Sequence, residues 1–75
     1  MTLNELKPGQ FAKIVKLHEL GELKRRIIDM GIIPGTKLMM KRIAPFGDPL
    51  QINVRGYELS LRKNDAKKIE IVKGE

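Results

Sequence analysis

The single histidine of the chain, His18, is followed closely by two carboxylates, Glu19 and Glu22. Imidazole and carboxylate groups are ligands of divalent transition metals, so these three residues are the candidate metal ligands. The chain has no Cys, and no second group of His or Asp residues completes a coordination shell. We therefore predict at most weak, exchangeable metal binding here and no resident cofactor.

Two other features bear on catalysis. The segment GIIPGTK, residues 31–37, shares letters with a phosphate-binding loop, but its glycines are one residue too close and Thr precedes Lys. A strand is predicted next, so no helix N-terminus is available to receive a phosphate. Ser60 lies on the polar side of a predicted strand, without a second His or an acidic partner at readable spacing. We predict that the chain is not an enzyme.

Two segments are candidates for contact with a partner. A basic run in a predicted helix is either a solvated face or a docking surface for an acidic partner. A rigid Pro/Gly loop follows later, and its Phe46 either folds inward as a plug or stands outside as an aromatic anchor. The candidate partner-binding residues are Lys24, Arg25, Arg26, Pro45, Phe46, Gly47, Asp48 and Pro49.

The net charge of the chain indicates which classes of partner it favours. Fifteen Lys and Arg residues against nine Asp and Glu residues give a formal charge of +6. Such a charge favours approach to nucleic acid, an anionic membrane face or an acidic protein. Proteins that bind single-stranded nucleic acid usually present several stacking aromatics, and this chain has two Phe and one Tyr. A small nucleic-acid-binding barrel is therefore an alternative, as is a metal carrier or sensor that uses His18.

The length predicts one domain, residues 1–75, which is too small for a large active-site cleft. The N-terminal residues lack the basic and apolar regions of a signal peptide, and no apolar run is long enough to span a bilayer. We expect a cytoplasmic protein.

One helix is predicted early in the chain, after a strand at residues 11–17 in which Ala12 and Ile14 face inward. Four apolar residues recur at helical spacing, which predicts an amphipathic helix of about ten residues. Gly31 is expected to end it in a left-handed conformation, with Ile32 packing back on Ile27. Pro34 prevents continuation, and Pro34-Gly35 fits the middle of a type II turn. The apolar stripe is Leu20, Leu23, Ile27 and Met30.

The second half of the chain is predicted to consist mainly of strands. Leu38 and Met40 alternate with polar residues, and two further alternating runs, residues 50–54 and 57–61, predict a hairpin. We expect a type I turn with Gly56 in a left-handed bulge, because a primed turn would force Arg55 to positive φ. Residues 62–68 fit one helical turn, and a last strand follows around residues 69–71.

This order predicts a mainly β fold. We expect an SH3-like small barrel of about five strands, with one amphipathic helix inserted after strand 1 and a short helical turn before the last strand. A five-stranded OB-fold is the competitor, but its helix usually lies between strands three and four.

The sequence resembles the FeoA family over nearly its whole length, most clearly over residues 23–69. The most specific matches are Arg26 with Met30-Gly31, Pro34-Gly35, Ala44-Pro45-x-Gly47-Asp48-Pro49 and Leu59-Ser60-Leu61-Arg62, and the earlier Leu3-x-x-Leu6-x-x-Gly9 also matches. Ile27, Met30, Gly31, Pro34, Gly35 and Gly56 are taken as the structural positions of this pattern.

The resemblance implies an SH3-like barrel with an inserted helix and an accessory role in bacterial ferrous iron uptake. The implied partner is the FeoB-type ferrous iron transporter, through its cytosolic GTP-binding domain, with recruitment to the inner face of the membrane only through that partner. No nucleic acid is expected. The same module resembles the C-terminal domain of iron-dependent repressors, whose DNA-binding region has no counterpart in these 75 residues.

Overall fold

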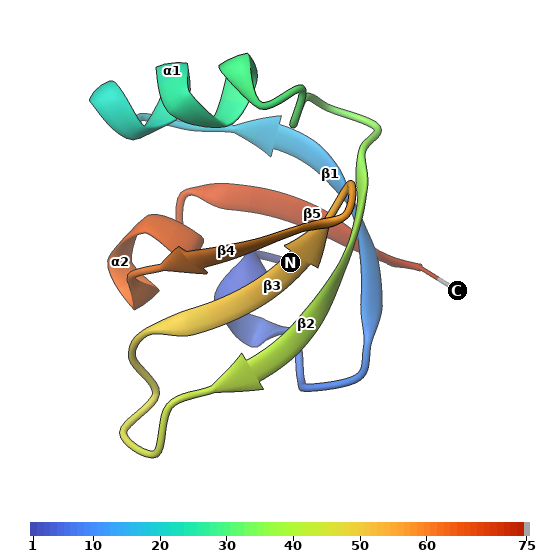
Figure 1. Ribbon diagram of the computed structural model, residues 1–75, viewed down its shortest axis with the longest axis vertical. Coiled ribbons are helices and arrows are strands. Elements are labelled where there is room, and N and C mark those ends of the chain that lie inside the picture. Colours follow the sequence, from blue (N-terminus) through green and yellow to red (C-terminus); the bar gives the residue numbers. More distant parts are fainter. Residues whose placement is uncertain (75) are drawn as a thin grey trace.

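Five antiparallel strands form one strongly bent sheet in the order β4-β3-β2-β1-β5 (Figure 1). The computed structural model describes residues 1–74. In chain order the elements are η1 (Leu3–Glu5), β1 (Phe11–Leu17), α1 (Glu22–Asp29), β2 (Lys37–Ile43), β3 (Leu50–Val54), β4 (Tyr57–Leu61), α2 (Lys63–Ala66) and β5 (Ile69–Gly74). The one longer helix lies between β1 and β2, so the predicted order of elements is confirmed.

The core fills the inside of the bent sheet with aliphatic side chains. Ala12 and Ile14 of β1 are both 2% exposed, as their alternation predicts. Met40 is fully buried whereas Met39 is partly exposed, which settles the inward face of β2. No polar or charged side chain of residues 1–74 is buried. Apolar packing therefore holds this domain together, without a disulfide.

The helix α1 ends as its sequence predicts, although it is slightly shorter than expected. Gly31 has a φ of 81°, and the Ile32 N–H donates to the Ile27 carbonyl at 3.1 Å. The Gly31 N–H donates to the Ile28 carbonyl at 2.8 Å. These two bonds form a Schellman motif, which turns Ile32 back into the core beside Ile27.

The connection from α1 to β2 is the predicted type II turn. Gly35 has a φ of 95°, and the Thr36 N–H donates to the Ile33 carbonyl at 3.0 Å. The segment that resembles a phosphate-binding loop is thus a turn that leads into a strand.

The β3–β4 hairpin differs from the prediction. Val54 pairs directly with Tyr57, so the turn has two residues, Arg55 and Gly56, with φ values of 51° and 82°. Positive φ at both positions is a type I′ turn, and the predicted type I turn with a G1 bulge is wrong. A type I′ turn matches the right-handed twist of the paired strands, and here that match outweighs the roughly 1–2 kcal/mol cost of a left-handed Arg.

A tertiary contact accompanies this turn. A Cβ atom added at Gly31 would lie 3.3 Å from Arg55 Nε, so the guanidinium group of Arg55 lies against the C-terminal end of α1. A cation at this end of a helix interacts favourably with the unpaired carbonyl groups there.

We expect Gly31→Ala to lower the free energy of unfolding by about 1–2 kcal/mol, because Ala pays the left-handed penalty and crowds Arg55. Urea unfolding followed by circular dichroism measures this change. Asp29→Ala, at an exposed position of the same helix, is the control. Equal stabilities of the two variants would contradict the assigned role of Gly31.

The first residues of the chain belong to the barrel. The Ile71 N–H donates a hydrogen bond to the Met1 carbonyl at 2.8 Å, and Thr2 forms a β-bridge with Glu70. Leu3 and Leu6 are 0% and 1% exposed, so the expected apolar clasp at the N-terminus is present. This segment covers the start of the free edge of β5.

Candidate partner-binding surfaces

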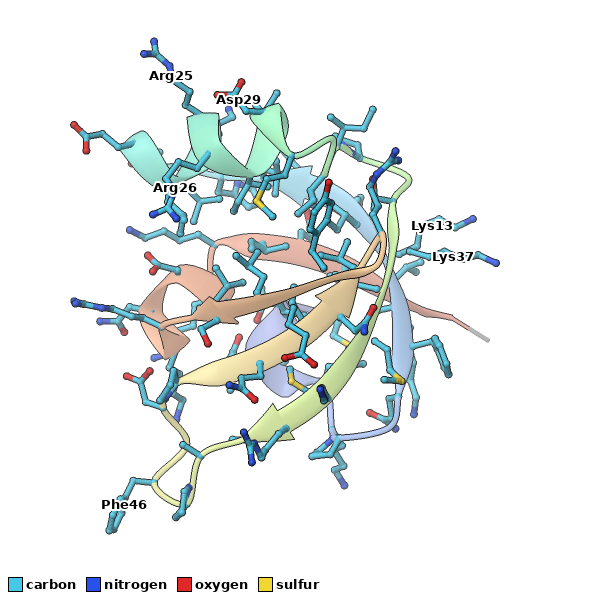
Figure 2. The ribbon with its side chains drawn as sticks, viewed as in Figure 1. Lys13, Arg25, Arg26, Asp29, Lys37 and Phe46 are labelled. Carbon is cyan, nitrogen blue, oxygen red and sulfur yellow. The ribbon has the colours of Figure 1, made fainter. Side chains whose placement is uncertain are left out.

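The basic run of α1 is fully displayed on the surface. Lys24, Arg25 and Arg26 are all exposed, and none of them takes part in an ion pair within residues 1–74. Figure 2 shows Arg25 pointing away from the barrel, while Arg26 extends from the lower side of the helix in that view. Glu22 and Asp29 lie on the same helix, so its eight residues carry three cations and two anions.

The loop at residues 44–49 presents an aromatic side chain to solvent. Phe46 is 97% exposed, which decides between the two predicted alternatives in favour of the outward one. The Gly47 N–H donates to the Ala44 carbonyl at 2.7 Å, and the Ala44 N–H donates to the Pro49 carbonyl at 3.1 Å. The two hydrogen bonds close the loop at its base and at its tip.

A side chain also ties this loop to the barrel. Asp48 Oδ1 accepts a hydrogen bond from the backbone N–H of Lys63, the first residue of α2, at 3.1 Å. The carboxylate meets an otherwise unpaired N–H group at the start of this short helix. Phe46 is therefore held outside by a loop that is fixed at both its backbone and its Asp48 side chain.

The structure separates the two candidate contact segments. Figure 2 shows α1 with Arg25 at one end of the longest axis and Phe46 at the other. That axis measures 28 Å. A single small contact cannot include both, so the predicted residues form two surfaces. We call residues 24–26 the helix surface and residues 45–49 the loop surface.

The candidate metal ligands do not come together. His18, Glu19 and Glu22 are exposed, and no group of three or more His, Asp or Glu side chains suited to a metal occurs in residues 1–74. His18 Nε2 instead lies 3.5 Å from Glu70 Oε2. Glu70 pairs with Lys16 across the β1–β5 ladder, so its nearness to His18 follows from the sheet and not from sequence spacing.

A third surface was not predicted from the sequence. Side chains and backbone of β1, β2 and β5 surround a depression of about 390 Å³ on the outside of the sheet. We call it the sheet groove; its lining residues are Phe11, Ala12, Lys13, Lys37, Val72, Lys73 and Gly74. The alternation of β1 already placed Phe11 and Lys13 outward, but only the strand register brings Lys37 and Val72 beside them.

The comparison with known proteins decides the family. The profile of the FeoA domain matches residues 1–73 of this chain. The chain belongs to the FeoA family. FeoA proteins are not enzymes, so the prediction of a chain without enzymatic activity is confirmed. No helix within residues 1–74 is long and apolar enough to cross a membrane.

One similar relative joins two proteins in a single polypeptide. It is the Fe(2+) transport protein A/Fe(2+) transporter FeoB fusion protein of Porphyromonas gingivalis, 38% identical over 71 residues. The match covers 95% of this chain and 8% of the fusion protein, so this FeoA-family chain spans only a small part of that relative.

Two solved FeoA structures share the fold. FeoA of Chlorobium tepidum superimposes with a TM-score of 0.89 at 38% identity, over 95% of this chain and 68% of that one. FeoA of Stenotrophomonas maltophilia, in complex with zinc and described as an SH3 domain protein, gives a TM-score of 0.83 at 28% identity, over 96% of this chain and 89% of that one. The predicted SH3-like barrel with an inserted helix is therefore confirmed.

Proposed function

We propose that this chain is an accessory protein of ferrous iron uptake, which binds the cytosolic GTP-binding domain of a FeoB-type transporter and supports or regulates its work. The FeoA–FeoB fusion relative is the observation that carries this proposal. Joining two proteins by a linker raises their effective concentration toward each other, which is useful where they act in contact. In this proposal the protein is cytoplasmic and reaches the membrane only through its partner. Iron is the cargo of the transporter.

The helix surface is the proposed main contact. Its three cations are exposed and unpaired in residues 1–74, so an acidic partner would neutralise them without breaking ion pairs within this domain. Complementary charges also speed the encounter of two proteins, which suits a reversible accessory.

The loop surface is the proposed second contact. Phe46 is a large apolar side chain on a loop held by hydrogen bonds, so binding costs little backbone conformational entropy. Aromatic side chains of this kind commonly dominate the energy of protein interfaces. Because the two surfaces lie at opposite ends of the barrel, the transporter domain would engage them with two separate regions or one at a time.

An NMR titration of the ¹⁵N-labelled chain with the cytosolic domain of its FeoB-type transporter tests the proposal. We expect saturable amide shifts in residues 22–29 and 44–49, measured with GDP and again with a GTP analogue. A difference between the two nucleotide states would assign a regulatory role, and equal affinities would assign an assembly role. The absence of shifts in both states, with the intact transporter also failing to bind, would overturn the proposal.

A further inference from the structure

The sheet groove gathers cations without compensation. Lys13 of β1 lies directly opposite Lys37 of β2 in the sheet register, and Figure 2 shows both side chains extending from the same side of the barrel. Like charges placed opposite each other across a sheet are unfavourable. Lys73 lines the same depression, and none of the three lysines has an ion-pair partner within residues 1–74. Among residues 1–74, no acidic residue lines the groove.

Apolar side chains lie among these cations. Phe11 is 47% exposed and Val72 is 53% exposed, and Val72 is the cross-strand partner of Lys13 on β5. Phe11 and Lys37 also line a neighbouring depression of about 370 Å³, which continues over β2 and β3 to Met39, Asn53 and Arg55. The two depressions therefore adjoin at Phe11, and Arg55 adds a fourth cation at the far end.

The dimensions of this surface fit a short extended segment. The adjoining depressions cross β5, β1, β2 and β3, which are neighbours in the sheet. Four strands at about 4.8 Å spacing extend over roughly 14 Å, the length of about four extended residues. An apolar side chain of such a segment would contact Phe11 and Val72, and carboxylates on either side would meet the lysines.

We infer that the sheet groove binds an acidic, extended polypeptide segment that carries an apolar side chain. Lys13, Lys37 and Lys73, which have no ion-pair partner within residues 1–74, supply the charge complement together with Arg55 at the far end, and the half-exposed Phe11 supplies the apolar contact. A platform for single-stranded nucleic acid presents several aromatics for stacking, whereas Phe11 is the one aromatic that lines these depressions. The surface is also concave, and insertion into a bilayer requires protruding apolar side chains.

This groove is separate from the two surfaces of the proposed function. In Figure 2, Lys13 and Lys37 lie at the right side of the barrel, whereas Arg25 and Phe46 lie toward the left, at the top and bottom. Binding of a peptide in the sheet groove can therefore be measured separately from binding of a FeoB-type transporter at those surfaces.

The test is an NMR titration of the full chain with synthetic octapeptides. The first peptide contains Asp and Glu with two central Leu residues, the second replaces its acids by Lys, and the third replaces its Leu by Ser. We expect the first peptide to shift the amides of Phe11, Lys13, Lys37 and Val72. Its affinity should fall at least about tenfold from about 0.05 M to about 0.5 M NaCl, because salt screens the ion pairs. The second peptide should not bind, and the third should bind more weakly than the first.

Lys37→Glu is the deciding variant, because it places opposite charges across from each other on β1 and β2. We expect its thermal midpoint to be equal to or above that of the parent, while its affinity for the first peptide falls at least about tenfold. Lys67→Glu makes the same charge change at the C-cap of α2, a helix that Figure 1 shows on the other side of the barrel from β1, and should leave the affinity unchanged.

Four outcomes would overturn the inference. They are no shifts with the first peptide at millimolar concentration, equal binding of its Lys counterpart, and undiminished binding by Lys37→Glu. The fourth is tighter binding of a single-stranded oligonucleotide, or of vesicles that contain phosphatidylglycerol, at the same residues. That result would assign the groove to nucleic acid or to the membrane surface.

Discussion

Replacing both Lys24 and Arg25 by Glu is expected to weaken binding to the cytosolic domain of the FeoB-type transporter by about tenfold to a hundredfold. Each exposed contact between opposite charges contributes up to about 1 kcal/mol, and reversal turns the attraction into repulsion. Both side chains are exposed and unpaired in residues 1–74, so the exchange removes no ion pair within the domain. Isothermal titration calorimetry at low salt measures the affinity. Ferrous iron uptake in cells that carry only the variant should fall with it.

The matched control reverses two charges elsewhere. Lys67 and Lys68 are exposed at and just after the end of α2, and their replacement by Glu changes the net charge equally. A loss of binding in this control as large as in the helix variant would show that total charge matters and not the helix surface. Phe46→Ser tests the loop surface separately, since Phe46 contacts solvent and contributes nothing to the core. Unchanged binding and uptake in the helix variant would remove the helix surface from the proposal.

Replacing Ile27 by Asp is expected to destabilise the domain by about 3–5 kcal/mol. Ile27 is 1% exposed and is the buried residue of α1, so the variant loses apolar contacts and places a carboxylate in the core. A domain of this length has a free energy of unfolding of about 4–11 kcal/mol, so the variant would be largely unfolded or close to it. Urea unfolding followed by circular dichroism measures the change.

The neighbouring residue provides the control for this experiment. Ile28 is 43% exposed on the same helix, and Ile28→Asp introduces the same side chain one position later. We expect it to change stability by less than about 0.5 kcal/mol. Similar losses in both variants would mean that helix formation, and not packing of Ile27 against the barrel, limits stability.

Features with local causes were predictable from the sequence. The order of the strands along the chain and the position of the helix after the first strand follow from apolar periodicity. The end of α1 follows from Gly31, Ile32 and Pro34, which act within a few residues of one another. The type II turn at Pro34-Gly35 has the same local origin.

Features that depend on tertiary contacts were not predictable in this way. The left-handed Arg55 is supported by strand twist and by its place against the end of α1, and neither is visible in the residues around it. The nearness of His18 to Glu70 requires the β1–β5 ladder. The helix surface and the loop surface lie at opposite ends of the barrel because of the way all the strands pack together. The sequence shows only that each segment adjoins a strand, and it does not show toward which end of the fold that strand points.

The pairing of β1 with β5 forms late during synthesis of the chain, because β5 is the last strand. β5 covers the outer edge of β1, so this edge stays open until residues 69–74 have been synthesised and have left the ribosome. An unpaired strand edge of this kind readily pairs with other chains. Polypeptides that stop short of β5 would therefore expose both the edge of β1 and the apolar core, and the cell would meet them as substrates of chaperones and proteases.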